Sequence, residues 1–191
     1  RVDATVAAIR KARAERADIL LTSGGASVGD YDLVQKGLAA EGLALSFWKV
    51  ALRPGRPMMH GRLGDMQVIG LPGNPVSAFV CALLFLVPLI RRLAGRTDVE
   101  PQTESAKLGV DLPANDERAD YMRAKLSAGS DGTRVATPIP IQDSSMMAAL
   151  ANADCLVIRE PFAPAVKAGG QCVILRLTPT FLRSLDLFTA N

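Results

Sequence analysis

Two glycine-rich segments with hydroxyl side chains carry residue types that bind anions. The first runs from Thr22 to Asp32 and reads Thr-Ser-Gly-Gly-Ala-Ser-Val-Gly-Asp-Tyr-Asp. Glycine lets the backbone approach a ligand closely, and hydroxyls and backbone N–H groups can cradle an oxyanion. Its candidate binding residues are Thr22, Ser23, Gly24, Gly25, Ser27 and Gly29.

Two carboxylates end this segment. Asp30 and Asp32 supply oxygen ligands of the kind that Mg²⁺ prefers beside phosphate groups. The pair is therefore a candidate magnesium site. The alternative is that one of them only caps the helix that follows.

The second segment, residues 70–77, reads Gly-Leu-Pro-Gly-Asn-Pro-Val-Ser. A structural strand-to-helix turn would explain an asparagine N-cap followed by proline at the first helical position. It would not explain a second glycine-rich loop facing the first across one sheet edge. Two helix N-termini aimed at one place indicate a ligand with more than one anionic group. The candidate residues here are Gly73, Asn74, Pro75 and Ser77.

A cluster of cations lies between these segments. Lys49, Arg53 and Arg56 occur within eight residues around a Pro-Gly turn. Strand alternation predicts that Lys49, Ala51 and Arg53 share one side, and arginine recognises tetrahedral oxyanions bidentately. A solvated charged face is the alternative. The single histidine, His60, has no catalytic partner in the sequence, so we expect any catalysis to rest on positioning and electrostatics.

The order of elements predicts an α/β domain over residues 1–97. Each glycine-rich segment follows a short apolar strand and precedes a helix, and alternation of strands and helices favours a mostly parallel sheet. A polar linker over residues 96–105 and several short strand-like runs follow, so a small all-β, barrel-like domain is predicted over residues 98–191.

Composition excludes several classes of protein. With 49% hydrophobic and 21% charged residues and a net charge of +3, the chain is typical of a globular protein and shows no basic-aromatic patch for nucleic acid. Three scattered cysteines favour reduced thiols and a cytoplasmic location. The apolar run at residues 76–90 is about five residues short of a membrane span, so we expect a buried core helix.

The segments at residues 22–32, 47–57 and 70–77 resemble, in order and spacing, those of the molybdopterin molybdenumtransferase family, which includes MoeA and the gephyrin E domain. The resemblance covers about residues 17–95 closely, and the rest of the chain resembles the family's C-terminal β domain more weakly. There, Arg123 and Ser144 match an arginine and a serine that the family contributes to its cleft.

The resemblance implies a MogA-like molybdopterin-binding domain and insertion of molybdate into adenylylated molybdopterin (molybdopterin-adenylate), with Mg²⁺ as cofactor and AMP released. It implies catalytic roles for Asp32, Lys49 and Arg53, with Arg56 beside them. The family often has lysine where Arg53 and Arg56 stand, and arginine excludes roles that need a neutral amine.

The resemblance further implies a homodimer and possible contact with the MogA-type adenylyltransferase, without nucleic acid or membrane partners. The family's two N-terminal domains and the first strand of its α/β domain precede the matched region, so we expect the isolated chain not to complete the reaction. Two alternatives remain: a MogA-like molybdopterin adenylyltransferase, which has no β domain after the long helix, and a non-catalytic pterin-binding or scaffold fragment.

Overall fold

The computed structural model describes residues 2–24, 33–130, 132–143 and 145–177. The chain divides into two compact units, residues 1–99 (unit 1) and residues 100–191 (unit 2). Unit 1 contains α1 (Val2–Ala14), β1 (Ile19–Ser23), α2 (Leu33–Ala40), β2 (Ala44–Trp48), β3 (Leu52–Arg53), β4 (Met59–Leu63), β5 (Met66–Leu71), α3 (Pro75–Cys81), a π-helical turn (Ala82–Leu86) and α4 (Val87–Leu93).

The sheet of unit 1 has the strand order β1-β5-β4-β2. Only β1 and β5 pair in parallel, whereas β4 is antiparallel to both β5 and β2. The prediction of a mostly parallel sheet is therefore wrong. The physical reason is a hairpin: Leu63 pairs with Met66 across two residues, and Gly64 takes the positive φ of 65° that such a tight turn requires.

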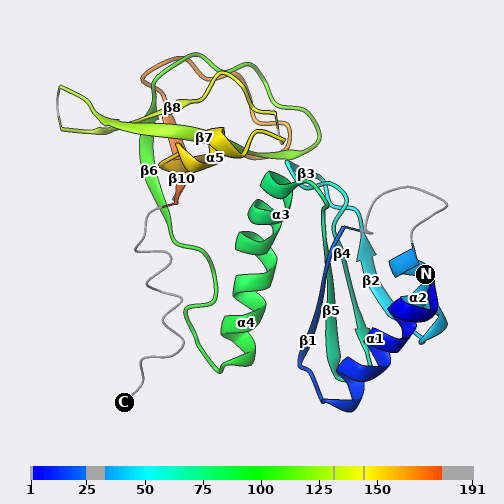
Figure 1. The fold of residues 1–191 in the computed structure, drawn as a ribbon. Coiled ribbons are helices and arrows are strands. Elements are labelled where there is room, and N and C mark those ends of the chain that lie inside the picture. The colour runs from blue at the N-terminus through cyan, green and yellow to red at the C-terminus, as the bar shows by residue number, and fades with distance from the viewer. Residues whose placement is uncertain (1, 25–32, 131, 144, 178–191) are drawn as a thin grey trace. The chain divides into compact units, whose positions relative to one another are not determined.

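Helices cover both faces of this sheet (Figure 1). α1 and α2 pack on one face, where Ile9 and Leu38 join Met59 and Val68 of the sheet in one buried cluster. The continuous helix from α3 to α4 lies on the other face, where its Phe85 ring is 6.4 Å from that of Phe47 in β2. Apolar side chains of the sheet thus pack against helices on both of its faces, as in other α/β domains.

The long helix spans Pro75–Leu93, 19 residues, and so exceeds the apolar run counted from sequence. Among the described residues, this is the one helix that is long enough and apolar enough to cross a membrane. Core helices of soluble proteins meet the same criteria of length and composition. Of the residues in its most apolar stretch, 39% are buried inside the structure. Its first turn, rather than its apolar middle, belongs to the candidate site.

Unit 2 is a five-stranded barrel with the order β7-β8-β6-β10-β9, closed by pairing of β9 with β7. The prediction of a barrel-like domain is confirmed. Its elements are β6 (Thr103–Leu108), β7 (Ala119–Ala128), β8 (Arg134–Pro138), α5 (Met147–Ala151), β9 (Cys155–Arg159) and β10 (Gln171–Arg176).

The first strand of the barrel begins inside the predicted linker. Its polar residues Thr103 and Glu104 pair with Leu175 and Ile174 of β10. The Glu104 carboxylate also forms ion pairs with Arg134 and Arg176. Polar composition suggested a loop, but ladder pairing and these ion pairs favour the strand.

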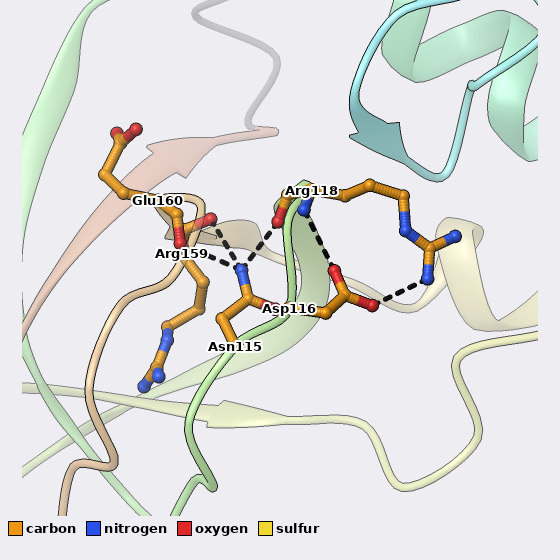
Figure 2. A network of polar contacts seen from close by, with 5 residues as sticks. All are labelled: Asn115, Asp116, Arg118, Arg159 and Glu160. Atoms are coloured by element: carbon orange, nitrogen blue, oxygen red, sulfur yellow. Dashed lines mark hydrogen bonds and ion pairs between the residues drawn. The ribbon is translucent and has the colours of Figure 1, made fainter.

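Two loops of unit 2 are joined by a polar network that Figure 2 shows. The Asn115 side-chain amide donates to the carbonyls of Arg118, Arg159 and Glu160, while Arg118 binds the Asp116 carboxylate at 2.7 Å. The buried Arg159 donates to backbone carbonyls of the same loops. These bonds are internal to the fold, so the network fixes the two loops and is not a candidate site.

Candidate functional site

Three strands of unit 1 end at the same edge of the sheet. Thr22 pairs with Gly70, Gly70 with Met59, and Met59 with Trp48, so these four residues form a row across β1, β5, β4 and β2. At roughly 4.8 Å between neighbouring strands, the row spans about 14 Å. The residues that follow β1, β2 and β5 all lie just beyond this row.

The two glycine-rich segments meet at this edge. The Gly24 N–H donates to the Leu71 carbonyl at 3.1 Å, and a Cβ placed on Gly73 would lie 3.5 Å from the Gly24 Cα. Gly24 has a φ of 78°, a left-handed conformation that favours glycine. The prediction that the segments face one another across one sheet edge is therefore confirmed for the described residues.

The start of the first segment lies on β1, where Ser23 is exposed and Thr22 is half-buried. Among the described residues, the buried Thr22 hydroxyl has no hydrogen-bond partner. A buried hydroxyl normally finds a hydrogen-bond partner, so the Thr22 oxygen is a polar group at this strand end that the described fold leaves unsatisfied. The predicted site residues Gly25, Ser27, Gly29, Asp30 and Asp32 lie outside the described residues.

The second segment begins the long helix in the way that its sequence predicts. The Asn74 side chain accepts a hydrogen bond from the Val76 N–H at 3.2 Å, and Pro75 occupies the first helical turn. Ser77 is buried in the same turn, while Gly73 is exposed. Asn74 therefore has a structural role as N-cap, and Gly73 presents the backbone surface that a ligand can approach.

The three predicted cations follow β2 on an irregular segment. Lys49 has a φ of 71°, and its backbone N–H donates to the Met58 carbonyl. β2 ends at Trp48, and Leu52–Arg53 forms the separate strand β3, so residues 49–51 lie on no strand and the alternation predicted for Lys49, Ala51 and Arg53 is wrong. The Lys49 ammonium instead lies 4.4 Å from the centre of the Trp48 ring.

A long-range contact positions the turn between Arg53 and Arg56. Gly55, with a φ of 127°, lies against the long helix, and a Cβ there would be 2.5 Å from the Cys81 Sγ. The Cys81 thiol donates to the Gly55 carbonyl at 3.5 Å. The sequence predicts only that Cys81 is a reduced thiol. No local signal indicates this contact, because 26 residues separate the partners.

In unit 2, Arg123 and the segment that carries Ser144 come together, although Ser144 itself lies outside the described residues. The Arg123 guanidinium is buried and donates to the Met146 and Ile141 carbonyls and to the Gln142 Oε1. Gln142 returns hydrogen bonds to the carbonyls of Arg123 and Ile139. Sequence reasoning did not select Gln142 as a site residue, yet it joins β7 to this segment.

The electrostatics of this segment follow from its hydrogen bonds. Burial lowers the pKa of Arg123, and the charge of Asp143 opposes that shift. The Ser145 backbone N–H and hydroxyl lower the pKa of Asp143, and the Arg123 charge adds to this effect. Because these hydrogen bonds of the buried Arg123 go to carbonyl and amide oxygens, its positive charge remains beneath the segment and favours a nearby anion.

The metal prediction rests on Asp30 and Asp32, both outside the described residues. Within the described ranges, no group of three or more histidine, cysteine or acidic residues could hold a metal ion. The His60 Nε2 lies 3.1 Å from the Gln67 Oε1, and the His60 ring lies 5.7 Å from that of Phe47, so these contacts support a structural role for this histidine.

Both units match known protein families. Residues 1–92 match the model described as probable molybdopterin binding domain, and residues 105–177 match the MoeA C-terminal region (domain IV). Molybdopterin molybdenumtransferase of Haemophilus influenzae is 34% identical over 155 residues, which are 81% of this chain and 38% of the relative. That of Bacillus subtilis is 32% identical over 157 residues, 82% of this chain and 36% of the relative.

Solved structures give the same result. The molybdopterin biosynthesis MoeA protein from Pyrococcus horikosii has a TM-score of 0.70 and 25% identity, covering 91% of this chain and 40% of that one. The molybdenum cofactor biosynthesis protein from Pyrococcus furiosus has a TM-score of 0.67 at 22% identity, covering 91% of this chain and 54% of that one, and supports the fold. The chain thus spans about two-fifths of the length of the curated relatives that it matches.

Proposed function

Because this chain belongs to the MoeA family, we propose that it carries part of the site where molybdate is inserted into adenylylated molybdopterin, with release of AMP, in molybdenum cofactor biosynthesis. The observation that carries the proposal is the contact of the half-buried Gly24 with the exposed Gly73, which joins the backbones of the two loops in one surface. A ligand with two linked phosphate groups suits such a surface, because glycine lets the backbone approach an anion closely and the N-terminus of the long helix favours negative charge.

The chemistry of this step is positioning and charge neutralisation. The loops at residues 22–29 and 73–77 hold the pterin nucleotide, while Lys49, Arg53 and Arg56 neutralise molybdate or phosphate oxygens. All three cations are exposed at the sheet edge or on the turn that follows it. The two arginines stay charged throughout, so they orient and stabilise anions and do not transfer protons. Arg123 and the Ser144 segment of unit 2 supply a second anion-favouring surface.

Magnesium is the proposed cofactor, held by Asp30 and Asp32 together with phosphate oxygens. When bound, Mg²⁺ neutralises charge on the phosphates. The proposed partners are a second copy of the protein and the MogA-type adenylyltransferase, in the cytoplasm. Two observations weigh against a MogA-like adenylyltransferase: the barrel of unit 2 and its match to the MoeA C-terminal region.

Ligand-induced stabilisation tests the proposal on the chain itself. Adenylylated molybdopterin at 100 times its Kd should stabilise the fold by about 2.7 kcal/mol, whereas AMP alone, lacking the pterin and one phosphate, should have a smaller effect. The measurement is the unfolding midpoint with each ligand, with and without molybdate. Equal midpoints with and without adenylylated molybdopterin would contradict the proposal. Adenylylation of free molybdopterin by ATP would instead favour the adenylyltransferase.

A further inference from the structure

A cavity of about 320 Å³ lies in unit 1 between α2 and β2, which are neighbours in Figure 1. Gln35, Lys36 and Ala39 line it from α2, Leu45 and Trp48 line it from β2, and Met59 of β4 contributes to its floor. Its volume falls in the range of small-molecule sites, and its walls combine apolar side chains with a few polar groups.

The cavity adjoins the row of strand-end residues described above. Trp48 and Met59 belong both to that row and to the cavity lining. Lys49, one of the proposed anion-binding residues, follows Trp48 directly and has its ammonium over the Trp48 ring. At roughly 4.8 Å between strands, Met59 lies one strand spacing and Trp48 two spacings, about 10 Å, from Gly70, the first residue of the second glycine-rich segment. A ligand that binds both loops therefore has the cavity within reach of its ring end.

The lining favours a flat heteroaromatic ring over other occupants. Trp48 is 38% exposed, so part of an aromatic surface remains accessible. Apolar walls from Leu45, Ala39 and Met59 suit a ring, and the lining has no carboxylate to hold a cation. The ammonium groups of Lys36 and Lys49 attract a ligand whose ring carries phosphates.

We propose that this cavity is a ring subsite, in which Trp48 packs against the pterin or adenine ring of the phosphorylated ligand whose phosphates bind the two loops. The inference rests on the proposed function and adds to it a specificity-determining residue. Aromatic stacking adds to the affinity gained from burial of the ring, and together we expect Trp48 to contribute roughly tenfold in affinity.

The chain contains one tryptophan, so its fluorescence reports on this cavity alone. We would titrate the full chain with pterin-6-carboxylate and, separately, with AMP, using N-acetyltryptophanamide to correct for light absorbed by each ligand. The expected result is saturable quenching by one of the two, which identifies the ring that binds. Quenching by neither ligand overturns the proposal.

Variants separate the cavity from the rest of the site. Ala39→Phe adds a ring to an exposed helix position that lines the cavity, and it leaves Trp48 as reporter. We expect it to reduce ring-induced quenching at least tenfold, while Trp48→Leu weakens binding about tenfold by calorimetry. The matched control is Phe162→Leu, an aromatic residue of unit 2 that is 74% exposed and should leave binding unchanged. Unchanged binding in Ala39→Phe overturns the subsite.

The same variants distinguish this inference from the proposed function. If adenylylated molybdopterin raises the unfolding midpoint equally in the wild type and in Ala39→Phe, without quenching Trp48, the function stands and the subsite is wrong. If adenylylated molybdopterin has no effect on the wild type, the function is wrong. In that case, a ring site is still supported if pterin-6-carboxylate or AMP quenches Trp48 saturably and Ala39→Phe abolishes this quenching.

Discussion

Gly24 and Gly73 lie against one another at the carboxyl ends of two parallel strands, with a Cβ on Gly73 only 3.5 Å from the Gly24 Cα. This contact brings two chain segments about fifty residues apart to one ligand surface. It also separates two roles of glycine. Gly24 has a φ of 78°, a left-handed conformation that favours glycine. Gly73 has no positive φ, and there the absence of a side chain leaves room between the two loops.

Gly73→Ala should weaken ligand binding without unfolding the chain. The added methyl would meet Gly24 at ordinary contact distance, so we expect a stability change within about 0.5 kcal/mol. The methyl occupies the surface between the loops, and loss of one charge-assisted hydrogen bond there corresponds to about tenfold in Kd. Calorimetric titration with adenylylated molybdopterin and urea unfolding measure the two quantities.

Gly24→Ala should reduce both stability and binding, because alanine disfavours the left-handed region by about 1 kcal/mol. The matched control is Gly64→Ala in the β4–β5 turn, where φ is 65° and no atom lies within 4 Å of an added Cβ. The control should show the same loss of stability with unchanged affinity. If both variants bound ligand equally well, the backbone at Gly24 would not be part of the site.

Gly55→Ala should displace the basic turn, because its Cβ would overlap the Cys81 Sγ. We expect weaker molybdate binding, by about tenfold, since Arg53 and Arg56 flank Gly55 on that turn. Cys81→Ala alone should have little effect on binding, and in combination with Gly55→Ala it should restore part of the affinity by making room. Equilibrium dialysis with molybdate measures all three. A double variant as weak as Gly55→Ala would show that the overlap is not the cause.

Arg123→Met should destabilise unit 2 by about 2–3 kcal/mol. The change leaves the Met146 and Ile141 carbonyls without the Arg123 donor, while the Gln142 Oε1 keeps its hydrogen bond from the backbone N–H of residue 123; each unsatisfied group costs about 1–3 kcal/mol before local relaxation. Arg134→Met is the control, because Arg134 forms a partly exposed ion pair with Glu104 that should contribute less than about 1 kcal/mol. Equal unfolding midpoints for the two variants would refute the role of Arg123.

The sequence predicted those parts of the site that local chemistry determines. Asn74 and Pro75 begin a helix because an N-cap and a first-turn proline are local signals. The direction of β4 was missed, although Gly64-Asp65 between two apolar runs is a hairpin signal. The positive φ of Lys49 and the contact of Gly55 with Cys81 depend on residues distant in sequence, which no local pattern encodes.

Alkaline pH should destabilise the fold through its buried thiols. Burial raises the pKa of Cys81 and of Cys155 to about 12, from an ordinary value of 9.0. Between these values an unfolded thiol ionises while the folded one stays protonated. The thiols therefore make their full contribution to the free energy of unfolding below pH 9. Above pH 9, that free energy falls by up to about 1.4 kcal/mol per pH unit for each thiol.

Urea unfolding at pH 7.5 and pH 10 checks this expectation, with Cys155→Ala compared with the wild type. The variant should lose about 1 kcal/mol less than the wild type between the two pH values, because one ionising thiol is removed. Lysine and tyrosine titration affects both proteins equally and cancels in the comparison. Iodoacetamide at pH 8 should modify the half-buried Cys172 well before either buried thiol. Faster modification of Cys81 or Cys155 than of Cys172 would contradict their burial.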